Sequence, residues 1–299
     1  MDGRLGNQLF RYAYARKLSI ETNQPIFFNF KNVIKKNWEI SINEFLIAPY
    51  ENKVVKNRPE YLLKKFIVDI YRFKRKVRLF FTTVEKRRIR DDKISLKYAK
   101  KLEKYGIFFI SEGFYNFNSL NHKHLILHGM FESSKYFDSI KEVLKIDLEP
   151  KIINHSNDKL IEDIRNSESV CVSIRRGDFL TGDIKKTHFV CDENYYNKAI
   201  QIIKEKLPEA KFFIFSDDIE WVKNNILCPE GSVFESGNDN VSEKLRVMKN
   251  CKNFILSNST FSWWCQYLSE NENKLVISPK RWSKIEYISD LIEEDWILI

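Results

Sequence analysis

Residues 170–178 combine a buried strand with a charged end, in the sequence Val-Cys-Val-Ser-Ile-Arg-Arg-Gly-Asp. The apolar run stops at Arg175, Arg176 and Asp178, which predicts a strand that delivers charge to the end of a sheet. Ligands of open α/β sheets bind beyond the carboxyl ends of the strands. Two guanidinium groups suit a phosphate-bearing ligand, because each planar fork grips phosphate oxygens in pairs. The other interpretation is a surface Arg-Arg pair with Asp178 as a turn residue or ion-pair partner.

Polar residues also follow a second predicted strand, at Ser216, Asp217 and Asp218. Paired aspartates can hold a divalent metal, or an aspartate can accept hydrogen bonds from a ribose or base. In the other interpretation Asp217 caps the helix that follows. We favour the acceptor or the cap over the metal, because the arginines already supply positive charge.

A third loop, Ser257-Asn258-Ser259-Thr260, stands between a strand and a helix. Backbone N–H groups and hydroxyls around one point form an anion site, although simple helix capping is the commoner role for such residues. Phe261 follows in the first helical turn, where the core is the commoner place for an aromatic ring.

A glycine-rich turn, Gly3-Arg4-Leu5-Gly6-Asn7-Gln8, opens the first expected helix. It does not match the dinucleotide fingerprint G-x-G-x-x-G, but it places two amide side chains, Asn7 and Gln8, at a helix N-terminus. The strand expected before such a turn is missing, so we expect either a truncated start or an N-terminal sheet that is one strand short.

Strands and helices alternate through the second half of the chain, which predicts a parallel, doubly wound sheet. The expected strands are 169–174, 211–215, 232–235, 253–256 and 274–277, and the expected helices are 193–206, 217–225, 241–250 and 260–268. In the first half we expect helices over 6–23 and 133–145, and strands over 25–30, 106–110 and 125–130. The polar stretch 151–159 is interpreted as the link between two domains, 1–155 and 156–299.

Positive charge is concentrated in residues 51–104, which hold 19 Lys and Arg against 7 Asp and Glu, whereas the whole chain carries +9. Within it, apolar residues recur at helical spacing over 61–90. This predicts an amphipathic basic helix that lies on an anionic membrane surface, binds nucleic acid or presents an ordinary solvated face. No nucleic-acid motif accompanies it, so the membrane is the better of the two binding interpretations.

Other compositional features exclude several classes of protein. No apolar run is long enough to span a membrane, and no signal peptide is visible. The five cysteines are dispersed without C-x-x-C pairs, which indicates reduced thiols in the cytosol and neither a zinc site nor a disulfide framework. The five histidines show no ligand spacing, and none is assigned a catalytic role.

Six segments, in order over nearly the full chain, resemble the bacterial α-1,2-fucosyltransferases of glycosyltransferase family 11. They are GRLGNQLFRYA (3–13), GMFESSKYF (129–137), RRGDF (175–179), FSDD (215–218), SNSTFSWW (257–264) and PKRW (279–282). One position departs from the family pattern H-x-R-R-x-D, because Ser173 stands in the place of the histidine. A hydrogen bond to the donor is then weakened or supplied by another group.

The resemblance implies an α/β, GT-B-like architecture of two Rossmann-like domains with a cleft between them, and an extra basic helical region in the first. It implies inverting transfer of L-fucose from GDP-β-L-fucose to a galactoside hydroxyl, in α-1,2 linkage and without a metal or other cofactor. Residues 156–299 would bind GDP-fucose, and residues 1–155 would bind the acceptor glycan of a surface polysaccharide or oligosaccharide.

Each candidate residue has an expected role in that reaction. Arg175 and Arg176 neutralise the departing diphosphate, Asp217 faces the ribose or guanine, and Asp178 is the candidate general base or orients the arginines. The residues expected to bind substrate are Gly6, Asn7, Gln8, Ser173, Ser216, Asp217, Ser257, Asn258, Ser259, Thr260 and Phe261.

Two other functions stay open at this point. One is a transferase that uses another nucleotide sugar. The other is a basic membrane- or nucleic-acid-binding protein in which the α/β domain is only a scaffold. We favour the fucosyltransferase in the cytoplasm, with GDP-fucose and a glycan as partners, peripheral contact with an anionic membrane through 61–90, and no nucleic acid.

Overall fold

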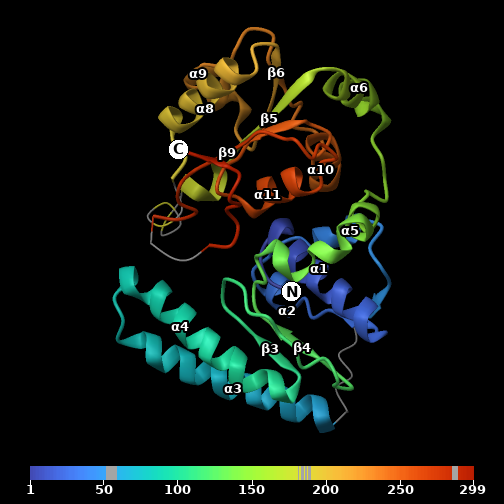
Figure 1. Ribbon diagram of the computed structural model, residues 1–299, viewed down its shortest axis with the longest axis vertical. Helices are drawn as coiled ribbons and strands as arrows, with labels where there is room; N and C mark the ends of the chain where they lie inside the picture. The colour runs from blue at the N-terminus through green and yellow to red at the C-terminus, as the bar shows by residue number, and fades with distance from the viewer. Residues whose placement is uncertain (52–58, 181, 183–184, 186, 188–189, 285–288) are drawn as a thin grey trace. The chain divides into compact units, whose positions relative to one another are not determined.

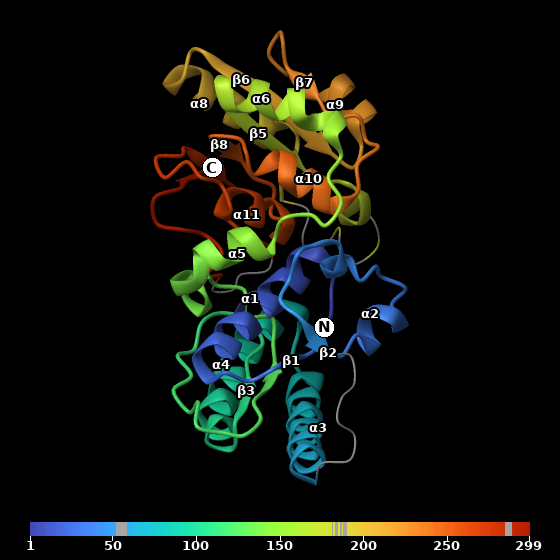
Figure 2. The ribbon, with the colours of Figure 1, turned by 90° about the vertical axis from the view of Figure 1, so that its right-hand side faces the viewer.

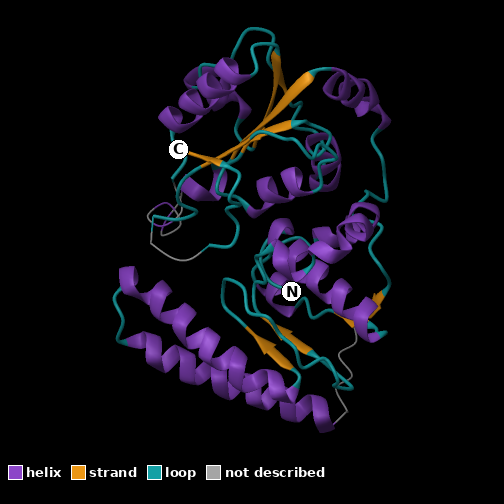
Figure 3. Cartoon of the chain, viewed as in Figure 1, coloured by secondary structure: helices purple, strands orange, loops and turns teal. Residues whose placement is uncertain are grey.

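The computed structural model describes residues 1–51, 59–180, 182, 185, 187, 190–284 and 289–299, and it confirms the α/β class (Figures 1 and 3). Contacts divide the chain into two compact units. Unit 1 comprises Met1–Asn43, Ile47–Asp147 and Ile285–Leu291, and unit 2 comprises Glu44–Leu46, Leu148–Lys284 and Ile292–Ile299.

Unit 2 is built on a six-stranded sheet in the order β10-β9-β8-β5-β6-β7, and all of its strand pairs are parallel (Figure 3). The strands are β5 (Glu168–Ile174), β6 (Ala210–Ser216), β7 (Val233–Phe234), β8 (Asn253–Ile255), β9 (Val276–Ser278) and β10 (Ile297–Leu298). The five strands predicted for this half are confirmed. The sixth, β10, is only two residues long, which is too short for a sequence pattern.

Helices cover both faces of this sheet (Figures 1 and 2). They are α6 (Asp158–Asn166), α8 (Glu193–Lys206), α9 (Ile219–Asn225), α10 (Val241–Met248) and α11 (Thr260–Tyr267). The last four match the prediction, whereas α6 begins inside the stretch expected to be a polar link. Its buried Ile161 and Ile164 are spaced by three residues and give the helix one apolar face.

The centre of the unit 2 core is β5, whose residues from Val170 to Ile174 are all buried. Val170, Val172 and Ile174 pack in one cluster with side chains of α8 such as Tyr196 and Ile200. Burying side chains of this size stabilises the fold by about 1.5–3 kcal/mol each. The strand that ends at the two arginines is therefore buried on both faces.

Unit 1 has two short parallel sheets, β1-β2 and β3-β4, among its described residues. Its elements are α1 (Leu5–Thr22), β1 (Ile26–Phe27), α2 (Lys31–Lys35), β2 (Tyr50–Glu51), α3 (Pro59–Phe80), α4 (Val84–Leu102), β3 (Ile107–Phe109), β4 (Ile126–His128) and α5 (Lys141–Asp147). The first helix is confirmed, and the three predicted strands are present but shorter.

The predicted helix over 133–145 is wrong in its first part. Phe137, inside the predicted range, has a φ of −147°, a conformation that does not continue a helix. The chain makes two 3-10 turns there, and the α-helix α5 begins only at Lys141.

The basic helix expected over 61–90 is instead a hairpin of two helices, α3 and α4, which lie side by side (Figure 1). The break falls at Thr82 and Thr83, β-branched residues that lower helix propensity, and Thr83 is extended with ψ at 157°. Buried Leu79 of α3 and Tyr98 of α4 then share a core cluster with Phe109 of β3. In the described part of the chain, none of the helices combines the length and apolar character needed to cross a bilayer.

Gly129 follows β4 and lies against the end of β3. A Cβ atom at this position would lie 2.3 Å from the carbonyl oxygen of Ile110, which belongs to the backbone and cannot move aside. Arg11 of α1 donates a hydrogen bond to the carbonyl oxygen of Gly129 at 2.8 Å. The absence of a side chain therefore lets the chain after β4 lie against the end of β3, where the Gly129 carbonyl accepts the hydrogen bond from α1.

We predict that Gly129→Ala lowers the free energy of unfolding by about 3 kcal/mol, because the added methyl group must displace backbone. Gly113→Ala is the control in the same unit, since its Cβ would meet only ordinary contacts at 3.5 Å, although its positive φ of 74° adds about 1 kcal/mol of strain. Urea unfolding followed by circular dichroism measures both variants. Equal losses would contradict this role for Gly129.

Candidate active site

The order of the strands in unit 2 places a switch point beside β5. From β5 the chain continues to β6 and β7 on one side, and it then crosses back to β8, β9 and β10 on the other. This is the 3-2-1-4-5-6 order of nucleotide-binding sheets, in which ligands bind where the direction of winding reverses. The loops after β5 and β8 flank that point, and they are two of the three loops singled out from the sequence.

The register of β5 and β6 brings the arginines and aspartates together. Ile174 pairs with Ser216, so the next residues along, Arg175 and Asp217, leave the sheet side by side. Nη1 of Arg175 lies 2.7 Å from Oδ2 of Asp217. The backbone N–H of Arg176 donates to Oδ1 of the same carboxylate at 2.9 Å. Both oxygens of Asp217 are thus engaged with the arginine loop.

The guanidinium of Arg176 is fixed on two sides. Its Nε donates to Oδ2 of Asp218 at 3.2 Å, and its central carbon lies 3.3 Å from the centre of the Trp221 ring. Stacking on an indole orients a guanidinium while leaving its edge available for hydrogen bonds. Trp221 was not identified from the sequence, because a tryptophan in a predicted helix is usually part of the hydrophobic core.

Gly177 leaves room for this ion-pair cluster. A Cβ atom on it would lie 2.5 Å from Oδ2 of Asp217, so a side chain at this position would push the carboxylate away from Arg175. The side chain of Asp178, the candidate general base, lies outside the described part of the structure.

The loop after β6 is organised by hydrogen bonds within unit 2. Oδ1 of Asp218 accepts from the backbone N–H of Trp221 at 3.2 Å and caps α9, so the helix cap is Asp218 and not Asp217. The Ser216 hydroxyl accepts from the N–H of Asp218 at 3.0 Å, and the N–H of Ser216 donates to Glu235 at 2.6 Å. Among the described residues, no group of three or more His, Cys, Asp and Glu could hold a metal ion.

Three buried serines join β5, β8 and α11. The hydroxyl oxygen of Ser262 lies 2.6 Å from that of Ser173 and 2.9 Å from that of Ser257. The hydroxyls of Ser173 and Ser257 are therefore both used inside the protein. The sequence predicts contacts with the donor for both, and in the structure their hydroxyls meet at Ser262 and join the two strand ends at the switch point.

The rest of the loop after β8 begins α11. Asn258 is buried and its amide donates to the carbonyl oxygen of Trp282 at 3.0 Å. The hydroxyl of Ser259 accepts from the N–H of Phe261 at 3.3 Å and caps the helix. Thr260 and Phe261 are half-buried at the first turn. The positive end of the α11 dipole thus lies beside the arginine loop at the same sheet edge, where it favours an anion.

A second group of cations lies at the carboxyl end of β9. Lys280, Arg281 and Lys284 line a hollow of about 460 Å³ together with residues that include Asp192. The segment 279–282 entered the sequence comparison without a role for its side chains. Its lysine and arginine add positive charge to the edge that carries Arg175 and Arg176.

In unit 1, Gln8 is fully buried and ties three segments together. Its Nε2 donates to the carbonyl oxygens of Gly3 at 3.0 Å and Glu39 at 2.8 Å, and its Oε1 accepts from the N–H of Ile42 at 3.3 Å. Gly6 is also buried. The hydrogen bonds of Gln8 hold the start of α1 against neighbouring segments, and Gly6 is packed inside unit 1.

Asn7 is half-buried and donates from Nδ2 to Oε1 of Glu132 at 3.1 Å. Burial raises the pKa of Glu132 to about 7, and the neighbouring Glu112 raises it further, whereas Arg11 and Arg88 oppose the shift. A carboxyl group that titrates near neutrality is suited to accept or donate a proton. Sequence reasoning missed Glu132, although it lies in the segment 129–137 that carried the resemblance.

We predict that Glu132→Gln flattens the pH dependence of stability. The folded-state pKa is raised from 4.5, so the native state binds more protons than the unfolded chain between pH 4.5 and 7. The free energy of unfolding therefore falls as pH rises through that window, by about 2 kcal/mol from this group. Urea unfolding at pH 5 and pH 7.5 measures the difference.

The matched control is Glu142→Gln, at a side chain that is 79% exposed on α5. It should retain the wild-type pH dependence. Glu132→Gln should keep part of the fall in unfolding free energy with rising pH, because burial raises the pKa of Asp92 to about 7 as well. A full wild-type slope in Glu132→Gln would contradict the shifted pKa.

Comparisons with known proteins identify the family of the chain. The family model "Glycosyl transferase family 11" matches residues 1–299. An alpha-1,2-colitosyltransferase of Escherichia coli is 30% identical over 100% of this chain and 97% of its own length. The O-antigen biosynthesis glycosyltransferase WbnK of Escherichia coli is 29% identical, over 99% and 98%.

Two more distant similarities were found. The mouse galactoside 2-alpha-L-fucosyltransferase Sec1 is 27% identical over 34% of this chain and 29% of its own length. A crystal structure of the alpha-1,6-fucosyltransferase NodZ soaked with GDP-fucose superposes with a TM-score of 0.46 at 10% identity, over 90% of each chain. The full-length family match and the full-length bacterial relatives establish the relationship: this chain belongs to glycosyltransferase family 11.

Proposed function

We propose that this glycosyltransferase moves L-fucose from GDP-β-L-fucose to a galactoside hydroxyl, in α-1,2 linkage and with inversion, during synthesis of a surface polysaccharide or oligosaccharide. The observation that carries the proposal is the arginine loop, in which Arg175 and Arg176 are held by Asp217, Asp218 and Trp221 at the switch point. The name of the mouse relative supports the donor sugar and the linkage, and the name of WbnK supports the pathway.

In the proposed step, the acceptor oxygen attacks C1 of fucose from the face opposite the diphosphate. The C1–O bond to the acceptor forms as the C1–O bond to the β-phosphate breaks, and the hydroxyl proton passes to a base or to water. Negative charge grows on the departing GDP. Arg175, Arg176 and the N-terminus of α11, with Ser259 and Thr260, would stabilise that charge without a metal.

Asp217 takes a different role in this proposal from the ribose contact expected from the sequence. Both of its oxygens bond the arginine loop, so we assign it as a positioning residue. Asp178 stays the candidate base from the sequence. Glu132 is a second candidate, supported by its pKa of about 7 and its contact with Asn7.

A second donor is favoured by one observation, the name of the 30% identical relative, which transfers colitose. Colitose and fucose are both deoxy sugars, so a small change in the sugar contacts would separate them. The interpretation as a scaffold that binds nucleic acid has no support in a chain that belongs to a glycosyltransferase family.

We predict that Arg176→Ala lowers kcat/KM for GDP-fucose at least a hundredfold, because a charge-assisted contact to the leaving diphosphate is lost. The rate of GDP release from GDP-fucose with a galactoside acceptor measures this kcat/KM, with and without EDTA. The wild-type activity should resist EDTA. Arg281→Ala, at an exposed arginine two strands away, is the control and should retain at least a tenth of the activity. Near-normal turnover by Arg176→Ala would contradict the assignment, and EDTA-sensitive release would move Asp217 and Asp218 to a metal site.

We also propose that the enzyme acts in the cytoplasm at the face of an anionic membrane. All five cysteines are free, as expected for a reducing compartment. On α3, Leu62, Phe66, Phe73 and Phe80 are 51–73% exposed. At 100° per residue they fall within about 40° of one another. This apolar stripe has Lys65, Arg72 and Lys76 on one flank and Lys74 on the other, which suits anionic lipid.

We predict that Phe66→Ser, Phe73→Ser and Phe80→Ser together weaken binding to vesicles of phosphatidylglycerol and phosphatidylcholine at least tenfold, because apolar insertion is lost. Co-sedimentation measures the binding. The control pair Ile152→Ser and Leu227→Ser removes side chains in unit 2 that are 79% and 77% exposed, and it should bind as the wild type does. Unchanged binding by the triple variant, or equal binding to neutral vesicles, would refute the contact.

A further inference from the structure

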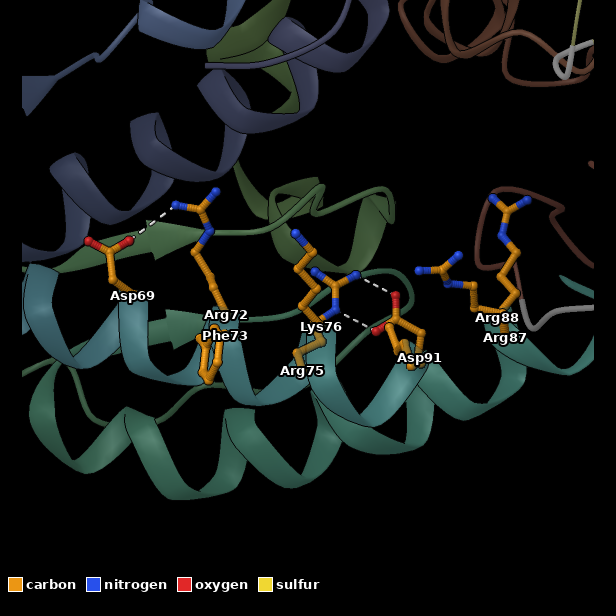
Figure 4. Close-up of a pocket in the computed structure, with 9 residues that line it drawn as sticks. Asp69, Arg72, Phe73, Arg75, Lys76, Arg87, Arg88 and Asp91 are labelled. Carbon is orange, nitrogen blue, oxygen red and sulfur yellow. Dashed lines mark hydrogen bonds and ion pairs between the residues drawn. The ribbon is translucent and has the colours of Figure 1, made fainter. Parts of the chain in front are cut away.

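A hollow of about 610 Å³ opens beside α3 and α4 in unit 1. Five cationic side chains line it, and Figure 4 shows that the charged ends of Arg72, Lys76, Arg87 and Arg88 point to the same side of the hairpin. Neither the arginine loop in unit 2 nor any of the residues expected from the sequence to bind substrate belongs to it. Its volume is in the range of small-molecule binding sites.

Three of the five cations have carboxylate partners. Arg75 of α3 makes a two-point ion pair with Asp91 of α4. Arg88 makes a second one with Glu112, with both N···O distances at 3.0 Å. These pairs fix the walls of the hollow, because each joins two different elements.

Arg72 pairs through Nη1 with Asp69 at 3.1 Å, one turn earlier on the same helix. Both of these side chains are about half exposed, so this bond contributes little to stability. It leaves the remainder of the guanidinium directed toward the hollow (Figure 4).

Lys76 and Arg87 have no hydrogen bond, ion pair or ring contact within the described ranges of the chain. One comes from each helix, and both are exposed. Two unpaired cations that share a hollow repel each other until an anion lies between them.

The charges of the hollow match a doubly charged ligand. The five cations face two carboxylates of the lining, Asp69 and Asp91, and Glu112 pairs with Arg88 from outside the lining, which leaves a surplus of two positive charges. Asp92 does not line the hollow, and burial beside Glu112 and Asp91 raises its pKa to about 7. A diphosphate diester carries two negative charges, whereas a phosphate diester carries one.

The hollow also borders the apolar stripe of α3. Phe73 lines the hollow and belongs to the stripe, with 68% of its surface exposed. A ligand whose anionic group lies among the arginines therefore has exposed apolar surface directly beside it. This combination suits an amphiphile.

We propose that the hollow between α3 and α4 binds the diphosphate of an amphiphilic acceptor, a glycan joined through a diphosphate to an apolar chain. Its assignment to the acceptor rests on the transferase function proposed above. Lys76 and Arg87 would bind the diphosphate directly, while the pairs Arg75–Asp91 and Arg88–Glu112 hold the walls.

Isothermal titration calorimetry of the full chain, saturated with GDP to occupy the donor site, tests this. The probes are inorganic pyrophosphate and geranyl diphosphate. We expect both to bind, and geranyl diphosphate to bind more tightly because its chain reaches Phe73. Lys76→Gln with Arg87→Gln should weaken both at least tenfold. Both side chains are exposed and unpaired, so the thermal unfolding midpoint should not change.

The control variant, Lys74→Gln with Lys97→Gln, removes one exposed lysine from each helix outside the hollow. It should bind pyrophosphate as the wild type does. No binding in the presence of GDP, or equal weakening in both double variants, would overturn the site. Equal affinity for the two probes would overturn the assignment to an amphiphile. GDP titrated into the same proteins reports the donor site separately, so a failed diphosphate site and a failed donor site are distinguished.

Discussion

The compensation of two adjacent arginines by two aspartates is the interaction on which the candidate donor site depends. Arg175 and Arg176 are neighbours in sequence, and like charges so close repel each other unless carboxylates are placed between them. The register that pairs Ile174 with Ser216 supplies those carboxylates from the next strand. Gly177 is part of the same constraint, because any larger residue would displace Asp217. The loop is thereby ordered before a ligand arrives, which is the condition for electrostatic stabilisation of a leaving group.

Unit 1 also carries adjacent positive charges that carboxylates compensate, but on a helical hairpin. Its excess of positive charge is carried on a hairpin, where Arg75–Asp91 and Arg88–Glu112 join separate elements and leave other cations exposed. The cluster of Asp92, Glu112 and Glu132 behind these pairs crowds carboxyl groups together. Their mutual repulsion, added to burial, raises the pKa values of Asp92 and Glu132. The same carboxylate, Glu112, thus pairs with Arg88 and raises the pKa values of the two neighbouring acids.

Several residues that were predicted to contact a ligand make hydrogen bonds inside the protein. The hydroxyls of Ser173 and Ser257 meet at Ser262, and Gln8 bonds three backbone atoms. Hydroxyl and amide groups serve equally well to bind a ligand or to satisfy buried backbone, so their residue type alone does not separate these roles. The Ser173 position, where the family pattern has histidine, is occupied here by a group small enough to bond the start of α11.

The sequence alone determined the parallel sheet of unit 2 and the place of its functional loops. Apolar strands such as 169–174, followed by helices at regular spacing, allow few other arrangements. Local patterns also indicated a cap at the start of α9, but they pointed to Asp217, and the structure uses Asp218. Only the tertiary structure decided the strand order, the pairing of Arg175 with Asp217 and the stacking of Arg176 on Trp221, because each depends on residues brought together across strands. The tertiary structure also decided that residues 61–90 form two helices. The turn at Thr82 lets both helices bury apolar side chains against β3, and this burial depends on residues that are distant in sequence.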